Sequence, residues 1–135
     1  MNEYTCTFPI GEENVKYAKY FTGKSFISDL SSDSSQVVID NVTFEPGCSN
    51  AWHIHNGAQQ ILICVGGEGW YQEEGKEAIK MKPGDIIEIP LGVKHWHGAT
   101  KDSWFSHLSV LSRSEMVNGS TEWKEPVSDE DYSKL

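Results

Sequence analysis

Short segments of alternating or continuous apolar residues, separated by turn residues, follow one another through most of the chain. Residues 59–65 form a continuous apolar run that ends at Gly66, and residues 35–44 are rich in Val and Ile and end at Glu45-Pro46-Gly47. No amphipathic helix of convincing length lies between such segments. The pattern predicts strands over residues 35–44, 51–56, 59–65, 69–72, 77–81, 85–89, 94–98 and 104–111.

Many short strands bounded by Gly and Pro predict an all-β fold, an antiparallel double-sheet sandwich or barrel. The 135 residues fill one domain, 1–135, whose core spans about 35–111. Residues 1–24 are expected to form an irregular lead-in or a short helical turn. Ser128 is followed by three acidic residues, which predicts an N-cap and a short C-terminal helix.

Composition narrows the classes of partner. Eleven Lys and Arg are dispersed among 20 Asp and Glu, which leaves a net charge of -9 and no basic patch. Nucleic acid is excluded as a partner because its phosphates need clustered Lys and Arg, and an anionic membrane surface is disfavoured for the same reason. No apolar stretch approaches membrane-spanning length. A small-molecule substrate is therefore the expected partner.

The cysteines and the N-terminus bear on the compartment. Cys6, Cys48 and Cys64 form no CxxC pair, and their odd number suits a reducing compartment. The first residues lack both the positive region and the apolar run of a signal peptide. We expect a cytoplasmic protein without a disulfide.

All five histidines fall into two short patches and one following strand. His53 and His55 form the first patch, His95 and His97 the second, and His107 lies on the last predicted strand. Side chains alternate across a strand, so each pair shares one face. If these faces point into a barrel, the five imidazoles converge on one cavity.

Each histidine taken singly is better explained as a hydrogen-bonded core residue. Five of them, with glycines and a proline at fixed offsets, instead favour a metal site. Neutral imidazoles and the amide oxygen of Gln59 are ligands that first-row transition metals accept. The sequence therefore predicts one divalent metal.

The two patches resemble the paired motifs of the cupin superfamily, G(X)5HXH(X)3,4E(X)6G and G(X)5PXG(X)2H(X)3N. The resemblance covers roughly residues 35–111 and implies a jelly-roll barrel. The matching positions are Gly47, His53, His55 and Gly66 in the first motif, and Gly84, Pro90, Gly92 and His95 in the second.

By this resemblance the metal ligands are His53, His55, Gln59 and His95, and the metal is Mn or Fe, with Ni or Zn as alternatives. The chain has Gln59 where the motif has Glu, and Ala99 where it has Asn. A neutral ligand set leaves the full 2+ charge on the ion, which strengthens it as a Lewis acid.

A closer resemblance lies in the strings Val-Thr-Phe-Glu-Pro-Gly, Ala-Trp-His-x-His-x3-Gln and His95-Trp96-His97-Gly98-Ala99. They are similar to small single-domain cupins grouped with carboxymuconolactone decarboxylase-associated proteins, which include manganese-dependent hydroxynitrile lyases. The helical decarboxylase domain of that association is absent from this sequence. In the group, the histidines that match His97 and His107 lie in the active cavity without all being ligands.

Three functions follow as alternatives. The first is a metal-dependent lyase or isomerase that acts on a small hydroxy or carbonyl compound. The second is an Fe(II) dioxygenase, and the third is a non-catalytic module that binds a metal or small ligand. For catalysis, His97 and His107 are the candidate acid and base groups, and His97 has an alternative role in orienting a ligand. Asn50 is expected to donate a hydrogen bond into the cavity.

A homodimer is the expected assembly. An open barrel edge favours association, and the lead-in carries the aromatic residues Tyr17, Tyr20 and Phe21. We expect this segment to cover the neighbouring subunit.

Overall fold

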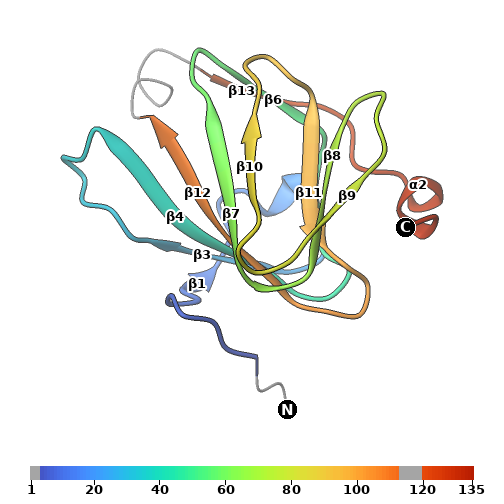
Figure 1. Ribbon diagram of the computed structural model, residues 1–135, viewed down its shortest axis with the longest axis horizontal. Coiled ribbons are helices and arrows are strands. Elements are labelled where there is room, and N and C mark those ends of the chain that lie inside the picture. The colour runs from blue at the N-terminus through green and yellow to red at the C-terminus, as the bar shows by residue number, and fades with distance from the viewer. Residues whose placement is uncertain (1–3, 113–119) are drawn as a thin grey trace.

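Strands make up most of the regular structure in the computed structural model, which describes residues 4–112 and 120–135 (Figure 1). The only helical elements in these ranges are the 3-10 turn η1 (Ala18–Tyr20) and the helix α2 (Asp129–Ser133). The strands are β1 (Glu12–Glu13), β2 (Phe21–Thr22), β3 (Ser25–Asp29), β4 (Val37–Phe44), β5 (Ser49–Asn50), β6 (His53–Asn56), β7 (Gln60–Gly67), β8 (Gly69–Glu73), β9 (Ile79–Met81), β10 (Ile86–Ile89), β11 (His95–Ala99), β12 (Phe105–Ser112) and β13 (Ser120–Trp123).

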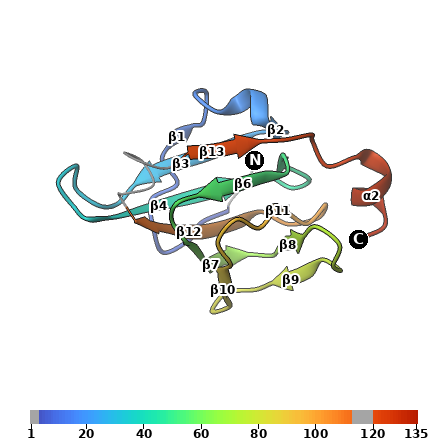
Figure 2. The same cartoon turned by 90° about the horizontal axis from the view of Figure 1, so that it is seen from above.

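The strands form two antiparallel sheets that face each other, as Figure 2 shows from above. The first sheet has the order β1-β3-β4-β12-β7-β10. The second has the order β13-β6-β11-β5-β2, and β8 joins it by pairing with β11 and β9. The predicted all-β, antiparallel double-sheet jelly-roll barrel is therefore confirmed.

Inward side chains of both sheets build the core. Along β7 every second residue is buried, and Leu62 and Cys64 of this row pack in the main apolar cluster. Phe44 on β4 and Phe105 on β12 are fully buried, with ring centroids 5.6 Å apart. Because strand side chains alternate, these positions define which face of each strand looks into the barrel.

A β-bulge interrupts the pairing of β7 with β12 beside His107. The pairing of β12 with β7 shifts between Ser106 and His107, so that Ser106 lies opposite Gly66 and His107 opposite Cys64. Gly67 next to the bulge has a φ of +65°, and a side chain there would collide with the backbone of Trp104. Glycine is therefore needed at this position. The pairing of β12 with β4 shows no such shift, so the regular alternation of β12 sets the inward direction of His107.

At the two ends of the chain, the structure agrees only in part with the prediction from the sequence. The C-terminal helix begins after Ser128, whose Oγ accepts a hydrogen bond from the Asp131 N–H at 3.1 Å, as predicted. The lead-in contains η1 but also the short strands β1 and β2, which pair with β3 and β5. Two-residue strands carry no periodicity of their own, so the sequence pattern could not show them. No helix in the described ranges is long and apolar enough to cross a membrane.

Candidate metal centre

Two paired strands of the second sheet bring His53 and His95 together. They are directly opposite in the pairing of β6 with β11, and their ring centroids are 4.2 Å apart. His53 Nδ1 lies 2.7 Å from the Ala51 carbonyl oxygen, and His95 Nδ1 lies 2.9 Å from that of Val93. Because a carbonyl oxygen only accepts, each Nδ1 carries the proton and each Nε2 keeps its lone pair for a ligand.

His97 joins this pair, and the three imidazoles form the one group of metal-ligating side chains found in the described residues. Ligand atoms of His53, His95 and His97 all lie within 4.8 Å of one another. Asn50 holds His97 in place, because its Oδ1 accepts from the His97 backbone N–H at 2.9 Å. Its Nδ2 lies 3.3 and 3.2 Å from the two ring nitrogens, so Asn50 donates into the barrel, as expected.

His55 lies beside this group and nearer to solvent. Its ring centroid is 5.1 Å from that of His53 and 5.6 Å from that of His95. Its Nδ1 lies 3.3 Å from Oγ1 of Thr121 on β13. His55 therefore shares the inward face with His53, as the strand alternation predicts.

The amide that faces the barrel is that of Gln60, which corrects the expectation for Gln59. Residues 57–59 form the bend between β6 and β7, and the Gln59 side chain is exposed. Gln60 begins β7 in the same buried row as Leu62 and is 7% exposed. Its Nε2 donates to Ser109 Oγ at 2.7 Å, whereas its Oε1 has no hydrogen-bond partner among the described residues.

The cupin motif could have shown this, because it permits either three or four residues between the second histidine and the acidic position. With four, Gln60 takes the ligand position and Gly67 takes the place of Gly66. The sequence satisfied both spacings, and only the length of the bend distinguishes them.

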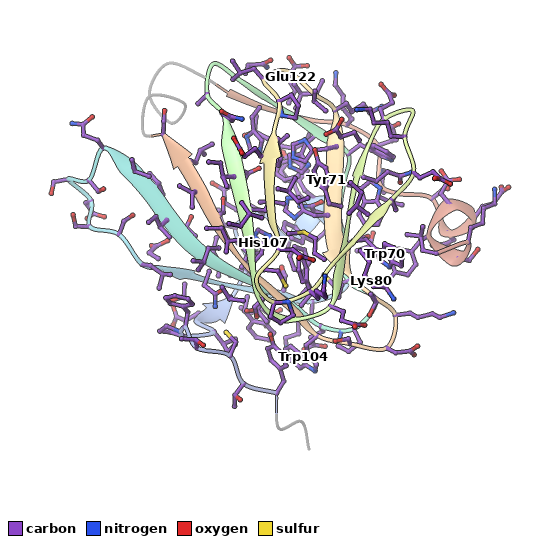
Figure 3. All side chains as sticks on the ribbon, viewed as in Figure 1. Trp70, Tyr71, Lys80, Trp104, His107 and Glu122 are labelled. Atoms are coloured by element: carbon purple, nitrogen blue, oxygen red, sulfur yellow. The ribbon has the colours of Figure 1, made fainter. Side chains whose placement is uncertain are left out.

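His107 lies against the group from the first sheet (Figure 3). It is fully buried, and its ring centroid is 4.7 Å from that of His97. Phe44 and Phe105 pack beside it, at centroid distances of 5.7 and 5.4 Å. Within residues 4–112 and 120–135, neither ring nitrogen has a hydrogen-bond partner of normal geometry.

Burial keeps these imidazoles neutral. It lowers the pKa of His95 and of His107 to about 4, and it lowers the pKa of His53 and His97 well below the usual value. Neighbouring imidazoles lower the pKa of His53 and His97 further. Since the neutral form binds metals, the site is in its ligating state at neutral pH.

The donor set fits a transition metal. His95 Nε2 and Gln60 Oε1 are buried acceptors without a hydrogen-bond partner in the described part of the chain. Such atoms are costly to bury unless a ligand satisfies them. A divalent ion held by imidazole nitrogens and an amide oxygen satisfies both atoms at once.

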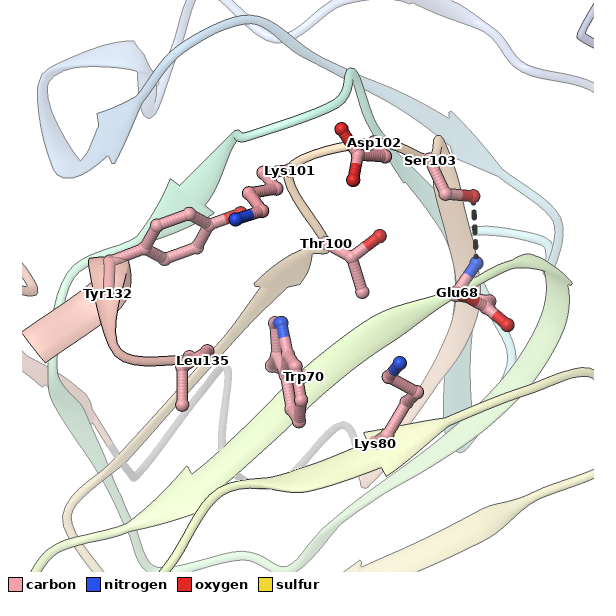
Figure 4. A pocket seen from close by; sticks show the side chains of 9 residues that line it. All are labelled: Glu68, Trp70, Lys80, Thr100, Lys101, Asp102, Ser103, Tyr132 and Leu135. Atoms are coloured by element: carbon pink, nitrogen blue, oxygen red, sulfur yellow. Dashed lines mark hydrogen bonds between the residues drawn. The ribbon is translucent and has the colours of Figure 1, made fainter.

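The surface pockets are separate from this group. A cavity of about 290 Å³ lies over the outer face of β8, lined by Trp70, Lys80 and Tyr132 among others (Figure 4). A neighbouring cavity of about 700 Å³ shares Trp70 with it. Lys80 Nζ lies 5.3 Å from the Trp70 ring centroid. No histidine lines either cavity in the described ranges.

The fold is therefore a β-barrel in which imidazoles converge between two antiparallel sheets and could hold a metal ion. Residues 41–111 match the family model described as the cupin domain, and the chain belongs to this family.

Two relatives are similar over most of their length. The chain is 39% identical over 119 residues to an (R)-mandelonitrile lyase of Granulicella tundricola, a match that covers 87% of this chain and 88% of the relative. A cupin-like protein from Thermotoga maritima has a TM-score of 0.85 and 36% identity, with 95% of each chain covered. A protein of the same organism described as a predicted oxalate decarboxylase has a TM-score of 0.68 and 23% identity over 76% of this chain and 92% of that one, which shows the fold alone.

Proposed function

We propose that this chain is a metal-dependent lyase that acts on a small α-hydroxynitrile or a related hydroxy or carbonyl compound. The observation that carries the proposal is the group of neutral inward imidazoles around His53 and His95. The 39% identity to an (R)-mandelonitrile lyase supports the reaction class. Isomerisation of a related compound would use the same groups.

The metal is proposed to be one divalent ion, Mn or Fe, with Ni or Zn as alternatives. Its ligands would be His53, His55, His95 and Gln60, which takes the role expected of Gln59. When bound, the ion would supply Lewis-acid chemistry toward a substrate oxygen, with its charge undiminished by the neutral ligands.

His107 and His97 are proposed to carry the proton. A neutral imidazole that is buried and close to the ligand group is able to take the proton of a substrate hydroxyl and to return it. Asn50 orients the His97 ring through the contacts described above. The 4.8 Å grouping with His53 and His95 also supports His97 as a ligand, in which case His107 alone carries the proton.

The test is turnover of mandelonitrile by the purified protein, followed as benzaldehyde release with and without oxygen. We expect turnover that persists without oxygen and is restored by Mn(II) after chelation. Strict dependence on oxygen and iron in a wider substrate screen would support the dioxygenase instead. Ligand binding without turnover under either condition would support the binding module.

Gln60 and Gln59 form a matched pair for testing the amide ligand. Gln60→Ala should weaken metal affinity by about 10-fold or more, because it removes a direct oxygen ligand. Gln59→Ala should leave the affinity unchanged, since the Gln59 side chain is exposed outside β7. Competition with a chromogenic chelator measures both. The opposite ranking of the two variants would restore Gln59 as the ligand.

We also propose a homodimer, but through a different surface than the sequence indicated. Tyr20 of the lead-in stacks on Trp123 at 4.3 Å, and Phe21 packs on Phe44 at 5.7 Å, so both serve their own subunit. The outer face of the first sheet carries half-buried apolar residues, including Ile63 on β7. Apolar residues gathered on the outer face of a sheet favour association.

Light scattering at micromolar concentration should give twice the monomer mass. Ile63→Lys should shift the protein to monomer, because it places a charge in the proposed interface. Ile79→Lys is the control, since Ile79 is 51% exposed on β9 of the second sheet. A wild-type monomer would contradict the proposal.

A cytoplasmic location is proposed as well. Cys6, Cys48 and Cys64 are all free thiols, which suits a reducing compartment. Burial raises the pKa of Cys48 to about 12 and that of Cys64 to about 11, so these two thiols are protonated and unreactive. Cell fractionation would test the location.

A further inference from the structure

Two acidic side chains face into the barrel beside the proposed site. Asp29 on β3 and Asp40 on β4 are directly opposite each other. Asp40 lies two positions before Val42 on β4, and Asp29 two positions after Ile27 on β3, and both of these apolar residues pack in the core cluster. Alternation therefore turns both carboxyl groups toward the inside of the barrel.

The carboxyl pair is connected to the site through Ser109. Asp40 is opposite Ser109 on β12, and Ser109 lies two positions beyond His107 in the same inward row. Ser109 Oγ accepts from Gln60 Nε2 at 2.7 Å. Gln60 is more than nine-tenths buried, and its Oε1 atom has no hydrogen-bond partner in the described residues.

Among the described residues, this end of the barrel is the more exposed one. Phe44 and Phe105, at the other end of β4 and β12, are fully buried. Asp40 and Ser109 are half-buried, and Asp29 is exposed. In Figure 1 the hairpin of β3 and β4 extends beyond the other strands at this end. We infer that the route from solvent to Gln60 and His107 lies at this end and passes the carboxyl pair.

The pair is electrostatically unfavourable as structure alone. Burial raises the pKa of Asp40 to about 7, and a hydrogen bond with Asp29 and the Asp29 charge add to this effect. No ion pair among the described residues neutralises either carboxyl group. Like charges directly opposite each other destabilise a sheet, so a role in stability does not account for them.

We propose that Asp29 and Asp40 are specificity-determining residues that admit uncharged hydroxy and carbonyl substrates and reject substrates that carry a carboxylate. This inference rests on the proposed function. A site with neutral ligands and a divalent ion attracts carboxylates, including hydroxy acids of the same size as the substrate. The carboxyl pair opposes this attraction, whereas a neutral nitrile, amide or aldehyde is not repelled.

The test compares two ligands of the same shape and different charge. Mandelamide is neutral and mandelate is an anion, and calorimetry at pH 8 measures the binding of each to the protein as purified. Wild type should bind mandelamide more tightly than mandelate. In Asp29→Asn/Asp40→Asn the affinity for mandelate relative to mandelamide should rise on the order of tenfold or more, because two nearby negative charges are removed.

The control variant Asp33→Asn/Glu88→Gln removes two charges from exposed side chains outside the barrel. It should leave the affinity ratio at the wild-type value. Asparagine has nearly the size of aspartate and removes a repulsion, so circular dichroism should show a folded double variant.

Several outcomes would overturn the inference. They are an unchanged ratio in the double variant, an equal rise in the control variant, and the absence of binding by either ligand to any of the proteins. Mandelonitrile turnover, measured in parallel, separates the two proposals. Turnover with an unchanged ratio would overturn the specificity role alone, and a changed ratio without turnover would overturn only the proposed reaction.

Discussion

Replacing His53 and His95 together by alanine is expected to abolish stoichiometric metal binding. These rings are opposite each other on β6 and β11, and backbone carbonyl oxygens fix both in the orientation that leaves Nε2 for a ligand. Loss of a group that merely supports a ligand costs about 10- to 100-fold in metal affinity. Loss of two direct ligands must cost more, and the variant should retain no metal after dialysis.

Metal analysis of protein purified without chelators measures this effect, and thermal melting in the presence of a chelator confirms that the variant is folded. His107→Ala is the matched control, because His107 is equally buried in the barrel but lies on the opposite sheet. It should retain one equivalent of metal. A full equivalent in the double variant would refute the ligand assignment.

The second large effect concerns turnover. His107→Ala should lower the rate on the order of 10² to 10⁴ because it removes a positioned base, while metal content stays unchanged. Burial lowers the pKa of His107 to about 4, so the ring is neutral throughout the neutral range. His97→Ala should lower the rate similarly if His97 shares this role.

Bound metal and turnover must be measured side by side on each variant. Loss of metal in His97→Ala would make His97 a ligand, as its closeness to His53 and His95 allows. Tyr71→Phe is the control for a change in the barrel wall, because Tyr71 is buried near His95 but its hydroxyl donates to Glu73. It should turn over near the wild-type rate. Unchanged turnover in both histidine variants would leave the proton role without a candidate.

Spacing along the chain predicts the direction of the histidines but not that of the glutamines. Alternation along a strand is local, so the shared faces of His53 with His55 and of His95 with His97 could be predicted from spacing alone. Spacing alone does not decide between Gln59 and Gln60. These two residues are adjacent, so they lie on opposite faces. Which of them faces the barrel depends on where β7 begins after the bend, and two motif spacings fit equally well.

The direction of the acidic side chains is likewise not determined by local spacing. In the sequence, nothing distinguishes Asp29 and Asp40 from the other Asp and Glu residues. Their inward direction follows from the pairing of β3, β4 and β12, which joins residues far apart in the chain. Likewise Tyr20 and Phe21 pack against Trp123 and Phe44 of the same chain, contacts that their positions in the sequence do not show.

The sequence by itself determined the all-β class, the jelly-roll family and the set of histidines, because turn residues, two-residue periodicity and motif spacing are local properties. Only the tertiary structure decided which amide faces the barrel, that Asn50 holds His97, and that Asp29 and Asp40 are directly opposite each other. These features depend on strand register and on the exact length of each bend, and a shift of one residue turns a side chain from the barrel interior to solvent.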